Sequence, residues 1–256
     1  MKAMILAAGL GTRLRPLTDD RPKALVTVAG KTLLEITIER LRSFDVDRII
    51  VNAHYFAEMI VDYLAAHHHF GMRIEVSREE MLLDTGGGLK NAAHFFLDDD
   101  IAADEPFILH NVDVISNIDL AAMVSFHREH GALATLAVQD RKTSRYLLFD
   151  EHGALCGRRA GLYGPVELDE SVEKARLANT VQALGFSGIH VLSPRIFARM
   201  KEEGAFSIID AYLRLAASGE KIVAYHADGN YWRDLGRPEE IAQAAEDRAR
   251  GKFCAE

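Results

Sequence analysis

Residues 1–35 read MKAMILAAGLGTRLRPLTDDRPKALVTVAGKTLLE, a short apolar run that ends at a loop broken by glycine. Gly9 and Gly11 interrupt the run, and Thr12 and Arg13 follow at once. The run has the length of a buried strand. A glycine-rich turn at the end of a strand exposes successive backbone N–H groups, which attract phosphate oxygens. The segment therefore predicts a strand followed by a cationic loop that binds a polyphosphate.

Two common phosphate-binding motifs do not fit this loop. The dinucleotide motif G-x-G-x-x-G needs a third glycine for close helix packing, and Leu14 stands in that place. A P-loop must close on Gly-Lys-Ser or Gly-Lys-Thr, and none follows. The loop therefore argues against a dinucleotide-dependent oxidoreductase and against a P-loop enzyme.

Strand-like and helix-like segments alternate along the rest of the chain. Apolar runs that predict strands recur as RIIVNAH, IEVS, PFILHNVDV, ALATLAV and FSGIHVL. Helical patterns are expected over residues 32–44, 57–69, 86–97, 119–129, 194–200, 208–217 and 238–250. This alternation is typical of an α/β fold built from βαβ units.

Composition limits the function classes further. With 256 residues, 48% of them hydrophobic, the chain can bury the core of one domain, and we expect a single domain over residues 1–256. The net charge of −8 argues against broad binding of nucleic acid or anionic membranes. No apolar run approaches the length of a membrane span, and the first one is too short for a signal peptide. The cysteines, Cys156 and Cys254, lack a metal or redox spacing, which suits a cytoplasmic protein.

The full wording of the opening segment resembles the signature of the sugar-phosphate nucleotidyltransferases, in which a G-x-G-T-R-x-x-P loop and a downstream P-K form the triphosphate site. The segments LLDTGGGLKNA, PFILHNVDVISNIDL, FSGIHVLSPRIF and YWRDLGRPEEI are similar to later motifs of the same family. The D-T-G-G-G wording and the short length look most like the N-acetylmuramic acid-1-phosphate uridylyltransferase branch or the mannose-1-phosphate guanylyltransferase-like proteins. The resemblance implies a single Rossmann-like, GT-A-like α/β/α sandwich with a mixed, mostly parallel central sheet.

The same resemblance implies a reaction and a set of site residues. A nucleoside triphosphate and a sugar 1-phosphate would give a nucleotide sugar and pyrophosphate, with Mg²⁺ as cofactor. Arg13, Lys23 and Asp113 would be catalytic, with Arg13 neutralising the leaving pyrophosphate and Lys23 contacting the phosphate where bonds change. Asp113 and Asp234 would hold the metal. The nucleotide would contact Ala8, Gly9, Gly11, Thr12, Thr85, Gly86, Gly87 and Asn111.

The chain departs from the family pattern at two places. Val112 replaces the glycine that usually precedes the metal Asp, where backbone meets ribose. The V-E-K-P segment, whose lysine grips the sugar phosphate, is not cleanly present, and Lys174, Arg158 and Arg159 are all candidates for its role. The polar stretch 157–180 is expected to form an excursion or lid on the sugar side.

The function inferred from these features is a Mg²⁺-dependent sugar-1-phosphate nucleotidyltransferase, most simply of uridylyl type. One alternative is a guanylyltransferase acting on a mannose-like or heptose-like 1-phosphate. An alternative of another class is a non-catalytic nucleotide-binding regulator, which the two departures favour. We expect a monomer or small homo-oligomer with no nucleic-acid or membrane partner.

Overall fold

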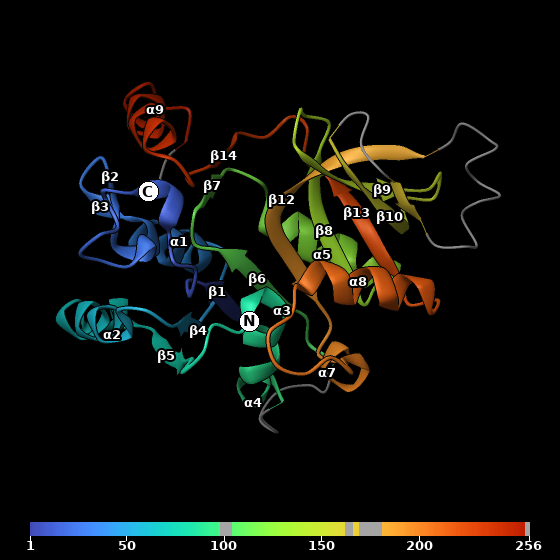
Figure 1. Cartoon of the computed structure of the whole chain (residues 1–256), viewed down its shortest axis with the longest axis horizontal. Coiled ribbons are helices and arrows are strands. Elements are labelled where there is room, and N and C mark those ends of the chain that lie inside the picture. The colour runs from blue at the N-terminus through green and yellow to red at the C-terminus, as the bar shows by residue number, and fades with distance from the viewer. Residues whose placement is uncertain (98–103, 162–165, 169–180, 254–256) are drawn as a thin grey trace.

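The opening apolar run forms a central strand, β1 (Lys2–Leu6). The structure is a computed structural model, which describes residues 1–97, 104–161, 166–168 and 181–253. Strand β1 pairs in parallel with β4 (Arg48–Ala53) and β6 (Phe107–Asn111), and β5 (Arg73–Arg78) continues the sheet beside β4. Because these four strands are parallel, their carboxyl ends lie at one edge of the sheet (Figure 1).

The other half of the sheet is largely antiparallel and is organised around the long strand β12 (Gln182–Leu192). Its carboxyl half pairs with β6 and its amino half with β9, so it joins the two halves of the sheet. The remaining strands of this half are β8 (Ala134–Gln139), β9 (Arg145–Phe149), β10 (Leu155–Ala160), β11 (Val166–Leu168) and β13 (Ile222–His226). Within the described residues, ten strands thus form one mixed sheet, as expected from the sequence.

Two short ribbons stand apart from this sheet. Strand β7 (Val114–Ser116) pairs antiparallel with β14 (Trp232–Asp234), and β2 (Thr27–Val28) pairs with β3 (Lys31–Thr32). The β7–β14 ribbon joins segments more than a hundred residues apart in the chain. It therefore brings the two predicted metal ligands, Asp113 and Asp234, close together.

Helices cover both faces of the sheet, which gives the three layers of an α/β/α sandwich (Figure 1). Along β1, Ala3 and Ile5 enter one core while Met4 enters the other, as the alternation of a strand requires. The first core is packed by α1 (Leu33–Arg42), α2 (Ala57–Ala66), α5 (Leu120–His130) and α9 (Pro238–Ala249). The second is packed by α3 (Asp84–Asn91), α4 (Ala93–Phe96), α7 (Ile196–Arg199) and α8 (Ile208–Ala217).

Local residue chemistry sets several helix ends. Thr32 caps α1, where its Oγ1 accepts a hydrogen bond from the N–H of Glu35 at 3.0 Å, and Asp119 caps α5 in the same way. The helix expected over 57–69 ends at Ala66 because His68 begins a run of residues with positive φ. The helix expected over 86–97 is divided into α3 and α4.

The expected excursion at 157–180 lies mostly outside the described residues. Its first residues belong to β10, and residues 166–168 form β11, which extends the sheet beside β10. A lid at this place therefore stays a prediction. Among the helices that the structure describes, none is both long enough and apolar enough to cross a membrane.

Buried histidines give the fold a predictable response to acid. His190 on β12 is buried, and its Nδ1 lies 2.8 Å from the Tyr212 hydroxyl oxygen. Burial, with a smaller effect of His110, lowers the pKa of His190 from 6.5 to about 3. Between those two pH values the unfolded chain binds a proton at this residue and the folded chain does not. The free energy of unfolding therefore falls as the pH falls from 6.5, by about 1.4 kcal/mol per pH unit from this group.

We expect His190→Asn to lose this share of the slope, because asparagine keeps a hydrogen-bonding atom near the place of Nδ1 but does not titrate. The measurement is urea unfolding of both proteins between pH 6.5 and 4. His152→Asn, in the exposed turn between β9 and β10, is the matched control and should keep the wild-type slope. Equal slopes for wild type and His190→Asn would show that His190 is protonated in the folded protein.

Candidate active site

The loop after β1 is fixed by contacts that its sequence supplies. Gly11 adopts a left-handed conformation with φ 65°, and its carbonyl oxygen accepts a hydrogen bond from Thr18 Oγ1 at 2.8 Å. A Cβ at Gly11 would meet Thr18 Cγ2 at 3.0 Å and Lys23 Cβ at 3.2 Å. Glycine is therefore required here both for its φ and for the close approach of the Lys23 segment.

The predicted nucleotide contacts of this loop differ in exposure. Ala8 is buried at the end of the strand segment, whereas Gly9 and Thr12 are exposed, and a Cβ at Gly9 would meet nothing within 4 Å. The backbone at Gly9 is therefore open to a ligand.

Four cations that follow the glycine turn, Arg13, Arg15, Arg21 and Lys23, differ in their surroundings. Arg15 forms an ion pair with Asp19 and Arg21 with Asp20, all at the exposed surface. Lys23 instead forms an ion pair with Asp113, and both of these side chains are largely buried. Arg13 and Lys23 both lie near Asp234. Lys23 points inward, whereas the side chain of Arg13 is exposed.

The two predicted metal ligands come together through the β7–β14 ribbon. Asp113 lies in the turn between β6 and β7, and Asp234 ends β14 opposite Val114. The N–H of Leu235 donates to the carbonyl oxygen of Asp113 at 2.7 Å. The backbone pairing therefore holds the two carboxylates at the same edge of the sheet as the loop after β1.

The electrostatics of Asp234 reflect this arrangement. Burial raises its pKa, and the neighbouring charge of Asp113 raises it further. The N–H of Gly236, which donates to Asp234 Oδ1 at 2.7 Å, together with Lys23 and Arg13, acts in the opposite direction. A carboxylate whose charge is disfavoured by burial and by a neighbouring carboxylate is stabilised by a cation.

A divalent metal fits this donor set. In the described residues no three His, Cys, Asp or Glu side chains gather into a metal cluster. Mg²⁺, however, is usually held by one or two carboxylates while substrate phosphates and water complete its shell. Asp113 and Asp234 supply that number of oxygen-bearing groups. The pair therefore fits Mg²⁺ bound together with a nucleotide.

Arg13, in the loop after β1, lies beside the carboxylate of Asp234. A Cβ placed on Gly236 would lie 2.7 Å from Arg13 Nη2 and 2.7 Å from Asp234 Oδ1. Glycine at position 236 therefore leaves the space that lets the guanidinium of Arg13 approach the Asp234 carboxylate. The cation of Arg13 and the carboxylate of Asp234 therefore lie close together.

Asn111 and Val112 take different directions at the end of β6. A Cβ on Gly188, whose φ is 74°, would meet Asn111 Nδ2 at 2.8 Å, so Asn111 occupies the space over a β-bulge in β12. Val112 is buried in the first core and its N–H donates to Leu6 O at 3.1 Å. Because the Val112 side chain packs into the core, the valine that replaces the family's glycine does not line the cavity described below.

The glycine-rich segment at 84–88 is packed more tightly than the sequence suggests. The N–H of Gly86 donates to Phe206 O at 2.9 Å, and a Cβ on Gly86 would lie 2.3 Å from the Phe206 ring. A Cβ on Gly87 would meet Gly204 O at 2.4 Å. Residues 204–206 therefore fill the side of these two glycines on which a side chain would stand. Of the predicted contacts Thr85, Gly86 and Gly87, it is Thr85 that lines the cavity described below, and its Oγ1 accepts a hydrogen bond from the N–H of Ile208.

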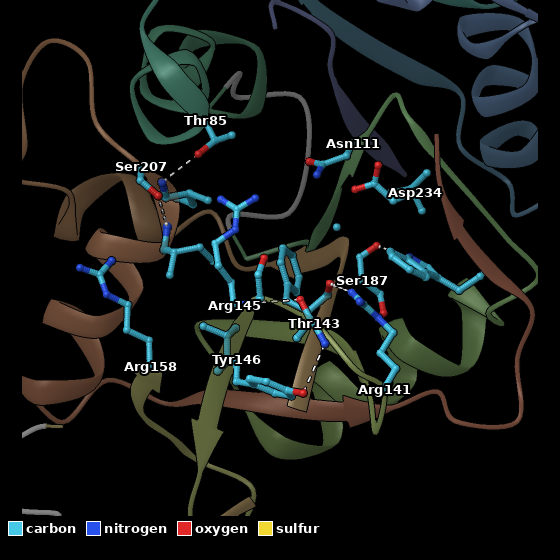
Figure 2. A pocket seen from close by; sticks show the side chains of 18 of the residues that line it. Thr85, Asn111, Arg141, Thr143, Arg145, Tyr146, Arg158, Ser187, Ser207 and Asp234 are labelled. Carbon is cyan, nitrogen blue, oxygen red and sulfur yellow. Dashed lines mark hydrogen bonds between the residues drawn. The ribbon is translucent and has the colours of Figure 1, made fainter. Parts of the chain in front are cut away.

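One cavity of about 1010 Å³ connects these parts (Figure 2). Arg13, Asn111 and Asp234 line one side, and Thr85 and Ser207 line another. Among the described residues that line it, eight are Arg or Lys and only three are Asp or Glu. A basic cavity in a chain of net charge −8 is suited to a polyphosphate ligand. Its volume is at the upper end of the range for small-molecule sites.

Arg141 is a cavity residue that the sequence analysis missed. It lies just after β8 with its guanidinium 3.8 Å from the centre of the Trp232 ring. Nothing in the local sequence distinguishes it from other loop arginines, because its partners Gly185 and Trp232 are 44 and 91 residues away. Only the fold brings these partners together.

The chain is similar to known proteins over nearly its whole length. Residues 2–251 match the family model described as Nucleotidyl transferase. The chain is 34% identical over 246 residues to N-acetylmuramate alpha-1-phosphate uridylyltransferase of Caulobacter vibrioides, covering 93% of this chain and 92% of that protein. It is 32% identical over 240 residues to a probable mannose-1-phosphate guanylyltransferase 3 of Oryza sativa subsp. japonica, covering 93% of this chain but only 62% of that protein.

A solved structure shares the overall fold. HddC from Yersinia pseudotuberculosis, in a crystal structure described as complexed with GMP-PN, superposes with a TM-score of 0.72 at 25% identity. The superposition covers 96% of this chain and 99% of that one. These matches confirm the resemblance to the sugar-phosphate nucleotidyltransferases, and the chain belongs to the nucleotidyl transferase family of enzymes.

Proposed function

We propose that the protein is a Mg²⁺-dependent sugar-1-phosphate nucleotidyltransferase of uridylyl type. It joins a nucleoside triphosphate to a sugar 1-phosphate and releases pyrophosphate. The observation that carries the proposal is that Arg13, Lys23, Asp113 and Asp234 gather at one edge of the sheet beside a basic cavity. We further propose that residues 1–256 form a single domain.

The proposed chemistry is an in-line displacement at the α-phosphorus, so positioning and charge stabilisation provide most of the catalysis. Asp113 and Asp234 would hold the Mg²⁺, which supplies positive charge against the phosphate oxygens when bound. Lys23 would contact the phosphate where bonds change. Arg13 would neutralise the charge that moves onto the leaving pyrophosphate.

The remaining predicted residues would bind the nucleotide. The backbone of Ala8, Gly9, Gly11 and Thr12 would approach the phosphates and sugar. Asn111 and Thr85 line the cavity and would contact ribose and base. Gly86 and Gly87 would act indirectly, because they let α3 pack against residues 204–206 and so fix the position of Thr85.

Support for a uridylyl enzyme comes from sequence similarity, because the Caulobacter uridylyltransferase is 34% identical to this chain over 246 residues. We expect UTP or dTTP to exceed GTP and ATP in kcat/KM by about 10-fold or more, because a pocket that hydrogen-bonds a pyrimidine edge rejects a larger ring.

The experiment is pyrophosphate release from a matrix of the four triphosphates and dTTP against several sugar 1-phosphates. N-acetylmuramic acid, N-acetylglucosamine, glucose, mannose and heptose 1-phosphates cover the substrate classes considered. Highest activity with GTP and a mannose or heptose 1-phosphate would replace the uridylyl proposal with the guanylyl one. The similarity to HddC, whose structure is described as complexed with GMP-PN, supports that alternative. Nucleotide binding without pyrophosphate release in any combination would favour the regulator.

A further inference from the structure

The cavity has one region to which no ligand group has been assigned. The proposed reaction needs a cation for the phosphate of the sugar 1-phosphate. Arg158 is engaged in an ion pair with Asp210, and Arg159 donates from Nε to Gly161 O at 3.1 Å. Lys174 lies outside the described residues. Arg158 and Ser207 lie on the opposite side of the cavity from Asp234, whereas Arg141 and Ser187 lie on the same side (Figure 2).

Arg141 is held in one pose from three directions. Its Nη2 donates to Phe186 O at 2.6 Å, and its guanidinium stacks on Trp232. Trp232 is itself fixed, because its Nε1 donates to Ser187 O at 2.7 Å. A Cβ at Gly185 would lie 2.9 Å from Arg141 Cγ, so glycine there leaves the space that the arginine occupies. The guanidinium is therefore preorganised, and little side-chain entropy remains to be lost on binding.

The same place contains polar atoms without partners. Arg141 Nε and Ser187 Oγ are buried and have no hydrogen bond in the described structure, and Ser187 is fully buried. Burial lowers the pKa of Arg141, which the nearby charge of Asp234 opposes. Unpartnered buried donors are costly, and an arginine surrounded in this way is stabilised by an anion.

We propose that Arg141, stacked on Trp232, binds the phosphate of the sugar 1-phosphate. This inference rests on the proposed function. The position of Arg141 fits the proposed reaction, because the attacking phosphate must lie beside the carboxylates that would hold the metal. Arg141 is near enough to Asp234 for their charges to interact. Trp232 and Gly185 are positioning residues for this arginine.

Kinetics of Arg141→Lys provide the first test. Lysine keeps the charge but lacks the planar group that stacks and donates from two nitrogens. We expect KM for the best sugar 1-phosphate to rise about 10-fold or more while KM for the triphosphate changes less than about 2-fold.

Arg40→Lys is the matched control. Arg40 is also buried over an aromatic ring, Phe44, with an Nε that lacks a partner, and it donates to Ile118 O. It does not line the cavity. Both KM values should keep their wild-type magnitude in this variant. Equal changes of both KM values in Arg141→Lys, or none, would overturn the inference.

Fluorescence of Trp232 provides a test that needs no turnover. Trp232 is the chain's single tryptophan. Titration with inorganic phosphate should change its emission in a saturable way in wild type and in Arg40→Lys, but not in Arg141→Gln or Gly185→Ala, where the stacked pose is lost. Glucose is the uncharged control. Identical responses in wild type and Arg141→Gln, including no response in either, would overturn the inference. A positive titration without pyrophosphate release would instead contradict only the proposed function.

Discussion

Replacing Arg13 by alanine should lower kcat about 100-fold to 1000-fold while the free energy of unfolding changes by less than about 0.5 kcal/mol. The side chain is exposed, so the fold depends little on it. Its guanidinium, however, lies beside Asp234 and Gly236 at the proposed metal site. A cation in this position acts mainly when charge moves onto the leaving pyrophosphate, so its loss should appear in kcat more than in KM.

Arg15→Ala is the control for this result. Arg15 belongs to the same loop and forms an exposed ion pair with Asp19, and its removal should leave turnover at the wild-type level. Both variants are compared by initial rates of pyrophosphate release and by urea unfolding. A folded Arg13→Ala enzyme with activity within a few-fold of wild type would show that Arg13 does not stabilise the transition state.

The second large effect is expected at the paired carboxylates. Asp113→Asn and Asp234→Asn should each reduce turnover by about 100-fold or more, because each removes one of the two groups proposed to hold the metal. The double variant should be little worse than the poorer single variant, as for residues that act as one unit. Higher Mg²⁺ concentration should restore part of the activity of the single variants.

These effects are measured as turnover against Mg²⁺ concentration. Asp62→Asn, at an exposed position of α2, is the control for loss of one negative charge and should behave as wild type. Fully additive defects in the double variant, or an Asp234→Asn enzyme with an unchanged Mg²⁺ dependence, would show that the two carboxylates do not share a metal.

Much of the fold follows from local signals in the sequence. The apolar run at residues 1–7 and the cap at Thr32 lie where the chain forms β1 and begins α1. The amino half of β12 was not expected, since Gln182 to Gly185 have no strong strand pattern. These residues become a strand because β9 pairs with them, which is a tertiary effect.

The site shows the same division between local and tertiary information. The cation run of the opening loop suggested a phosphate site, but not that Arg15 and Arg21 would pair at the surface while Lys23 pairs with Asp113. The resemblance places Gly86 and Gly87 among the nucleotide contacts, and the structure shows that they also allow close packing against residues 204–206. Sequence spacing does not report which neighbour will fill the space beside a glycine.

Family resemblance supplied what local pattern could not. Asp113 and Asp234 are 121 residues apart in the chain, and no periodicity connects them. Their convergence depends on the antiparallel pairing of β7 with β14. Neither the local sequence pattern nor the family resemblance predicted Arg141, because Gly185, Phe186 and Trp232 surround it only after the chain has folded.

The fate of labelled phosphate tests the central claim most directly. Purified protein is incubated with Mg²⁺, a sugar 1-phosphate and UTP labelled either at the α-phosphorus or at the γ-phosphorus. The account predicts that the α label appears in a nucleotide sugar and the γ label in pyrophosphate, in equal amounts and only when metal and sugar 1-phosphate are both present. Release of the γ label as inorganic phosphate, or of either label without the sugar 1-phosphate, would contradict it.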